Sequence, residues 1–127
     1  MEVPELESWI DAYVLAWATN DAKAIGDLFG ENARYYTHPF REPWKGREEI
    51  VRKWLEHPDP PGSWKASYSP VALTGNTGVI RGTTKYFKDD GSLDTEFANI
   101  YVIEFDDEGR ATEFTEWFME SNPPARD

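Results

Sequence analysis

Two neighbouring stretches, TEFANIYVIEF at 95–105 and TEFTEWFM at 112–119, decide the fold of this chain. Each alternates between two sets of side chains, and an extended strand places alternate residues on opposite faces. The residues between them, Asp106-Asp107-Glu108-Gly109, predict a tight turn, because glycine tolerates a positive φ and aspartate caps nearby backbone groups. The two stretches therefore predict an antiparallel β-hairpin.

One face of this hairpin combines polar and aromatic side chains. Pairing sets the odd positions of the first strand beside the even positions of the second, and a register slip of two residues leaves every side chain on its face. That face then carries Phe97, Asn99, Tyr101, Phe114, Glu116 and Phe118. Polar groups among aromatic rings are typical of the wall of a ligand cavity.

The opposite face of the hairpin is also largely apolar, with Trp117 and Met119 on it. An apolar sheet face of this size is rarely left in water. We therefore expect it to form the interface of a homodimer.

Composition restricts the classes of function. The chain has 127 residues, which fits a single domain spanning 1–127 with its own core. Its net charge of −11 argues against nucleic acid and anionic membranes as partners, because both require a positive surface. The charge also predicts a ligand that is neutral, or anionic only beside a local arginine. The six Trp, six Tyr and seven Phe favour a flat-walled pocket for a small hydrophobic molecule.

Several common signals are missing from the sequence. It has no cysteine, which fits a reducing compartment, and no apolar run of membrane-spanning length or basic-then-apolar leader. We expect a soluble, cytoplasmic protein. Neither His57-Pro58-Asp59 nor the acidic turn at 106–108 has the ligand pattern of a metal site. With no phosphate loop, nucleophile elbow or dinucleotide motif either, we expect no metal and no cofactor.

The rest of the chain predicts three helices followed by a meander of strands. An apolar stripe with helical spacing begins at Pro4 and runs to Trp17, which predicts a first helix. Asp21 can cap a short second helix that ends at Gly30. Gly46 precedes a third helix, which is predicted over 47–57. Strands are predicted over 33–38, 64–73 and 79–87, before the hairpin, and a frayed tail from Asn122. This order is typical of an α+β fold.

A family resemblance rests on the spacing of several short segments along the whole chain. These segments are Trp9-Ile-Asp-Ala-Tyr13 through Asn20-Asp21, Leu28-Phe29 with Ala33, His38-Pro39, Gly46 through Ile50 with Trp54, the Asp107-Glu-Gly-Arg110 turn, and Glu116-Trp117-Phe118. In this spacing the chain resembles the nuclear transport factor 2-like superfamily, which includes ketosteroid isomerases and SnoaL-like polyketide cyclases. The resemblance implies a cone-shaped α+β barrel, with three N-terminal helices packed in a curved, mostly antiparallel sheet around an apolar pocket.

Three positions extend the resemblance to ketosteroid isomerases. Tyr13 matches their helix-one tyrosine, which donates to a substrate oxyanion, and His38 stands where they place an aspartate general base. Tyr101 stands where they place a second donor, a protonated carboxylic acid. A neutral imidazole accepts a proton and a phenol donates a hydrogen bond at neutral pH. The resemblance thus implies one base, His38, and two donors, although two of the three residue types differ from those of the isomerases.

Glu116 is the basis of a second resemblance. It matches a catalytic aspartate in limonene-type epoxide hydrolases, which resemble the same fold, but this chain has Asn99-Ile100-Tyr101 where they have an Arg-x-Asp pair. Arg81 would supply the missing cation if its face of the 79–87 strand points inward. Glu116 and Arg81 would then form either part of a site or a structural ion pair.

Four functions follow as hypotheses. The first is a cofactor-independent, isomerase- or cyclase-like enzyme that transfers a proton on a hydrophobic carbonyl compound. Its reacting residues would be His38, Tyr13, Tyr101 and Glu116, and its ligand contacts Trp17, Trp54, Arg81, Asn99, Phe114 and Phe118. The alternatives are a non-catalytic binding module, an epoxide-hydrolase-like enzyme, or an association domain with a filled pocket. Convergence of His38, Tyr13 and Tyr101 on one cavity point would favour the enzyme.

Overall fold

A computed structural model describes residues 1–121 as three helices and six strands. The tail expected from Asn122 lies outside the described residues. The helices are α1 (Val3–Thr19), α2 (Ala22–Asp27) and α3 (Arg47–Glu56). The strands are β1 (Phe29–Tyr36), β2 (Trp44–Lys45), β3 (Trp64–Thr74), β4 (Thr77–Phe87), β5 (Leu93–Phe105) and β6 (Ala111–Glu120).

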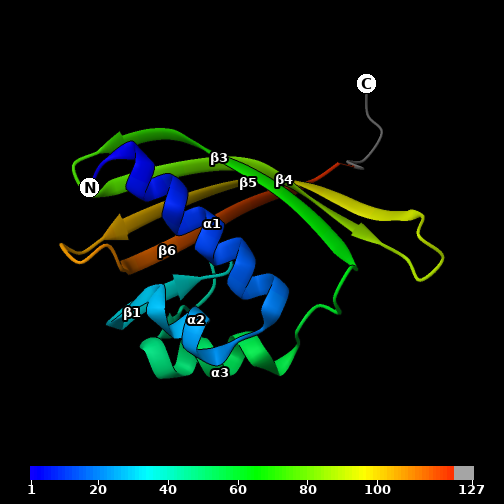
Figure 1. The fold of residues 1–127 in the computed structure, drawn as a ribbon, viewed down its shortest axis with the longest axis horizontal. Helices are drawn as coiled ribbons and strands as arrows, with labels where there is room; N and C mark the ends of the chain where they lie inside the picture. Colours follow the sequence, from blue (N-terminus) through cyan, green and yellow to red (C-terminus); the bar gives the residue numbers. More distant parts are fainter. Residues whose placement is uncertain (122–127) are drawn as a thin grey trace.

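The strands form one sheet in the order β2-β1-β6-β5-β4-β3. Adjacent strands in this sheet pair antiparallel, except that β1 and β6 run parallel to each other. The sheet is open and curves around α1, while α2 and α3 lie beside β1 (Figure 1). This arrangement confirms the predicted α+β cone with three helices and a mostly antiparallel sheet.

The C-terminal hairpin has the register that its alternation predicts. Tyr101 pairs with Glu116, Asn99 with Phe118 and Ile103 with Phe114. In the turn, the Asp106 carboxylate accepts hydrogen bonds from two backbone amides, and Gly109 adopts a φ of 82°. The polar and aromatic face is therefore continuous across both strands.

The helix boundaries follow local signals, with two corrections. Asp21 caps α2 as predicted, because its carboxylate accepts from the backbone amides of Lys23 and Ala24. However, α2 ends at Asp27, and Gly30 belongs to β1, which begins four residues earlier than predicted. The two-residue strand β2 was not predicted, since it is too short to show a periodic pattern.

The hydrophobic core lies between α1 and the inner face of the sheet. Its largest fully buried side chains are Leu6, Ile25, Phe29, Ile50, Ile80, Ile103 and Phe114. Because Ile80 and Thr84 point into the core, the even positions of β4 face inward and the odd positions face outward. Of the helices within residues 1–121, none is long and apolar enough to cross a membrane.

Candidate functional site

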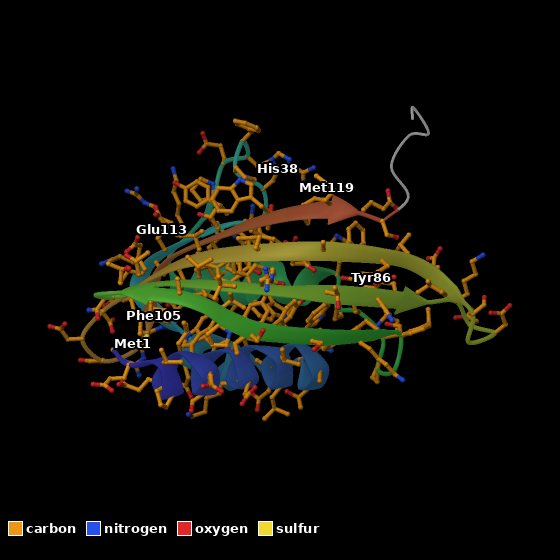
Figure 2. The ribbon with its side chains drawn as sticks, turned by 90° about the horizontal axis from the view of Figure 1, so that it is seen from above. Met1, His38, Tyr86, Phe105, Glu113 and Met119 are labelled. Atoms are coloured by element: carbon orange, nitrogen blue, oxygen red, sulfur yellow. The ribbon has the colours of Figure 1, made fainter. Side chains whose placement is uncertain are left out.

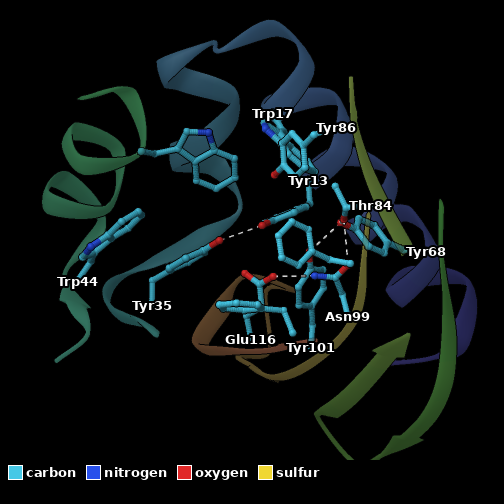
Figure 3. A pocket seen from close by; sticks show the side chains of 13 residues that line it. Tyr13, Trp17, Tyr35, Trp44, Tyr68, Thr84, Tyr86, Asn99, Tyr101 and Glu116 are labelled. Atoms are coloured by element: carbon cyan, nitrogen blue, oxygen red, sulfur yellow. Dashed lines mark hydrogen bonds between the residues drawn. The ribbon is translucent and has the colours of Figure 1, made fainter. Parts of the chain in front are cut away.

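A cavity of about 300 Å³ opens inside the cone, between α1, α3 and the inner face of the sheet (Figure 3). Ten of its thirteen lining residues are aromatic, namely Tyr13, Trp17, Tyr35, Trp44, Trp54, Tyr68, Tyr86, Phe97, Tyr101 and Phe118. The other three are Thr84, Asn99 and Glu116. A concave, mostly apolar site with a few convergent polar groups is typical of small-molecule binding.

The cavity has a buried end and a partly exposed end. At the buried end, Tyr13, Tyr35, Tyr101, Thr84 and Asn99 are each at most 6 % exposed. The other aromatic lining residues keep more contact with solvent, and Phe118 is 47 % exposed. The exposed end of the cavity lies at Phe118, and Phe97 joins Phe118 to Tyr86 and Trp17 in one row of neighbouring rings.

A chain of hydrogen bonds crosses the buried end and reaches Glu116. The Thr84 hydroxyl donates to the Asn99 side-chain oxygen over 3.0 Å, so its single proton is used there. The Tyr68 hydroxyl must then donate to Thr84, and the Tyr101 hydroxyl donates to Tyr68 over 2.9 Å. Asn99 completes the chain by donating its amide to Glu116 Oε2 over 2.8 Å (Figure 3). All four donors thus point in one direction, toward the carboxylate.

Glu116 is the ionisable centre of the cavity. Burial among aromatic rings raises its pKa from 4.5 to about 7, against the opposing effect of the hydrogen bond from Asn99. A carboxyl group with this pKa is present in both protonation states at neutral pH. It can therefore accept a proton and return it.

Tyr13 and Tyr35 form a second polar pair. Their hydroxyl oxygens lie 2.8 Å apart, and either can donate to the other. Because each hydroxyl has one proton, the pair keeps one donor for another acceptor. Burial raises the pKa of both groups, so both phenols stay neutral donors at physiological pH. The rings are held by Phe114, which stacks on Tyr35 at 4.5 Å and on Tyr13 at 5.4 Å between ring centroids.

The structure brings together most of the residues predicted from the sequence. Tyr13, Tyr101 and Glu116 line the one cavity, as do the predicted ligand contacts Trp17, Trp54, Asn99 and Phe118. Phe114 is the exception among the aromatic contacts. It is fully buried beneath the two tyrosines and supports the wall without lining it.

His38 lies outside this cavity. It follows β1 beside β6 (Figure 2), and its ring meets Phe118 edge-on at 6.0 Å between centroids. Its Nδ1 accepts a hydrogen bond from the backbone amide of Phe40, which lies in the turn that follows Pro39. The expected convergence of His38 with Tyr13 and Tyr101 is not found, because His38 lies beyond the end of β1 at Tyr36 and is not among the residues that line the cavity.

Arg81 also differs from its expected position. It is exposed on the outer face of β4, opposite Ile100 of β5, because the even positions of that strand face the core. It forms no ion pair with Glu116 among the described residues. The cation that the epoxide-hydrolase hypothesis required is thus absent from the cavity lining.

The sequence analysis missed five lining residues, Tyr35, Trp44, Tyr68, Thr84 and Tyr86. The strands β3 and β4 carry polar and apolar residues on both faces, so alternation alone does not say which face is inner. The missed signal was Ile80, since a large apolar residue sets the face shared by Thr84 and Tyr86. Within residues 1–121, the structure gathers no group of three His, Cys, Asp or Glu side chains that would hold a metal ion.

Comparison with known proteins agrees with this fold. Residues 10–114 match the family model of the SnoaL-like domain. The chain therefore belongs to the SnoaL-like domain family of the nuclear transport factor 2-like superfamily. Comparison with curated proteins gave no significant match.

Two solved structures illustrate the similarity in fold. One is a candidate ketosteroid isomerase from Kribbella flavida DSM 17836, with a TM-score of 0.73 and 17 % identity over 98 % of this chain and 85 % of that chain. The other is an NTF-2-like protein of unknown function from Burkholderia xenovorans LB400, with a TM-score of 0.71 and 18 % identity over 98 % of this chain and 88 % of that one. At these identities the similarity concerns the fold alone.

Proposed function

We propose that this protein is a cofactor-independent enzyme that transfers a proton on a hydrophobic carbonyl compound, in an isomerisation, cyclisation or dehydration. The single observation that carries the proposal is Glu116, a carboxyl group with a pKa of about 7 inside an aromatic cavity. A base whose pKa lies near the working pH is the most effective at exchanging protons with a substrate. The cavity volume of about 300 Å³ suits a compound of one or two rings.

In the proposed step, the ionised Glu116 removes a proton from the carbon next to the substrate carbonyl. The electron pair of that C–H bond moves into a C=C bond, and the negative charge passes from the carboxylate to the carbonyl oxygen. Return of the proton to the same or another carbon completes an exchange or an isomerisation. No electron acceptor or metal is needed for this sequence.

The Tyr13–Tyr35 pair is the proposed donor to the developing oxyanion. It keeps one unused proton, and Figure 3 shows both hydroxyls facing the space in front of Glu116. A neutral donor aimed at developing charge in a site shielded from water stabilises the transition state more than the ground state. Tyr101, by contrast, uses its proton on Tyr68, so it positions the hydrogen-bond chain.

Exchange of deuterium into a simple ketone tests the proposal. We expect the wild-type protein to accelerate exchange at the methyl group of 4-tert-butylacetophenone in D₂O, followed by proton NMR. Glu116→Gln should reduce the catalysed rate by about 10²–10⁴-fold, the usual contribution of a general base. The wild-type rate should rise with pH through an apparent pKa near 7 and then level, because the base must be ionised.

Glu120→Gln is the matched control for that experiment. Glu120 lies at the end of the same strand, is exposed and does not line the cavity, so the variant removes one charge without altering the site. Equal catalysed rates in the wild type and Glu116→Gln would contradict the assignment of the base.

A non-catalytic binding module is the second candidate. It is favoured by the chain from Tyr101 to Glu116, whose donors are already paired within the protein. A wall of this kind binds a ligand without having to rearrange. Saturable binding of the ketone by calorimetry, with no exchange above the buffer rate at any pH between 5 and 9, would select this candidate.

We also propose that the protein acts as a homodimer through the outer face of β5 and β6. Trp117 is 45 % exposed and Met119 is 72 % exposed on this face. Burial of such side chains against a second copy removes apolar surface from water. Light scattering should give a dimer mass that Trp117→Lys shifts to a monomer, whereas a monomeric wild type would contradict the proposal.

A further inference from the structure

Within residues 1–121, the side chains that line the cavity carry negative charge and no positive charge. Among its lining residues, all of which lie within the described part of the chain, Glu116 is the single charged group, and there is no lysine, arginine or histidine. Arg81, the expected counter-charge, faces outward on β4. An anionic ligand would therefore approach a carboxylate in a poorly solvated space without any compensating cation.

A second carboxylate stands next to the partly exposed end. Asp59 lies in the loop between α3 and β3, and its Oδ2 accepts a hydrogen bond from Trp17 Nε1 over 2.8 Å. Burial raises the pKa of Tyr86, and the negative charge of Asp59 adds to that rise. Trp17, which donates to Asp59, lines the cavity, and so does the neighbouring Tyr86. The entrance thus combines a negative charge with the rings of Trp17 and Tyr86.

The aromatic rings at this end are held in fixed positions. Trp17 stacks on Trp64 with 3.6 Å between ring centroids and 9° between planes. Its centroid lies 6.4 Å from that of Tyr86. Trp64 covers one face of Trp17, and Trp17 itself lines the cavity together with Tyr86. Faces of tryptophan and tyrosine attract organic cations, because the ring carries a negative quadrupole on each face.

We propose that the natural substrate is a hydrophobic carbonyl compound that also carries an ammonium group, and that this cation binds between Trp17, Tyr86 and Asp59. The carbonyl group then points to the buried end, toward Glu116 and the Tyr13–Tyr35 pair. The substrate class rests on the proposed function only for its carbonyl end. The cation site itself follows from the aromatic rings and the two carboxylates.

This assignment fits the charges during proton transfer. The negative charge moves from Glu116 to the substrate oxygen, so the cavity and substrate oxygen together stay at −1 throughout. An ammonium group held at the entrance attracts the charge in either position. The net charge of −11 also concentrates cations near the protein and repels anions of the same shape.

Three ketones of nearly equal shape test the inference. They are the cation 4-acetyl-N,N,N-trimethylanilinium, the neutral 4-tert-butylacetophenone and the anion 4-acetylbenzenesulfonate. Calorimetry should show the cation binding roughly tenfold more tightly than the neutral ketone, the difference expected of a desolvated cation–π contact. The anion should bind most weakly. Equal or tighter binding of the neutral ketone would overturn the inference.

A pair of charge-neutralising variants locates the cation. Asp59→Asn keeps an oxygen that accepts from Trp17 but removes the charge, so it should reduce the preference for the cation over the neutral ketone by about threefold or more. Asp107→Asn removes the same charge from the exposed turn between β5 and β6 and should leave that preference unchanged. Equal loss of preference in both variants would show a general charge effect and overturn the proposed location.

The same samples separate this inference from the proposed function. If the cation binds preferentially but no ketone exchanges deuterium, the proton-transfer function fails and the cation site stands. If the neutral ketone exchanges and the cation has no advantage, the function stands and the substrate class is overturned. Exchange is compared with the buffer-catalysed rate of each ketone, because the three substituents alter the acidity of the methyl group.

Discussion

At alkaline pH, the Glu116→Gln variant should be more stable to unfolding than the wild type. Burial raises the pKa of Glu116 from 4.5 to about 7, so the fold favours the protonated carboxyl group. Its stabilising contribution is therefore fully present below pH 4.5 and is lost as the pH rises through 7. At about 1.4 kcal/mol per pH unit, the full shift corresponds to about 3 kcal/mol. Contact of the cavity with solvent reduces this to roughly 1–2 kcal/mol.

Urea unfolding at pH 5 and pH 8.5 measures this contribution. The wild type should lose more stability between the two pH values than Glu116→Gln, and the difference between the two losses should be roughly 1–2 kcal/mol. Glu120→Gln controls for the removal of a carboxylate from an exposed position on the same strand. If the variant and the wild type lose the same free energy, Glu116 does not carry a raised pKa, and its assignment as the base loses its support.

Four further substitutions test other parts of the structure by urea unfolding. Thr84→Val removes a hydroxyl that bonds Tyr68 and the buried Asn99 and should cost about 1–3 kcal/mol, whereas a neutral result would contradict the chain of hydrogen bonds. Gly82→Ala places a methyl group against the Tyr68 ring and the Ser67 carbonyl, so it should cost at least about 1–3 kcal/mol. Ile103→Ala opens a cavity in the core and should cost about 2–5 kcal/mol. Asp21→Ala removes the cap of α2 and should cost about 1 kcal/mol.

The sequence predicted the parts of the fold in which one face is clearly apolar. The β5–β6 hairpin alternates over eight or more residues on each strand, and a slip of one residue would turn Phe114 and Ile103 out of the core, so its register was predictable. The cap at Asp21 was predictable for a similar reason, because the signal is local. The face on which Arg81 lies was not predictable, because β4 has polar residues on both faces and the burial of Ile80 in the core decides which face points inward.

The position of His38 was unpredictable for a different reason. Its place in the sequence matches a catalytic position of a related fold, but its place in space depends on where β1 ends. The strand stops at Tyr36, and the following turn directs the imidazole to the backbone of Phe40. The odd positions Ala33 and Tyr35 of β1 are buried, so the even-numbered His38 would not share their face even in a longer strand.

The exclusion of Arg81 from the cavity determines the chemistry of Glu116. A guanidinium beside this carboxylate would form a charge-assisted pair, lower its pKa and hold it permanently ionised. The structure gives it one neutral donor instead, the amide of Asn99, whose oxygen is fixed by Thr84. One neutral hydrogen bond orients the carboxylate but does not outweigh the cost of burying its charge. Glu116 therefore remains free to gain and lose a proton near neutral pH, which a structural ion pair with Arg81 would have prevented.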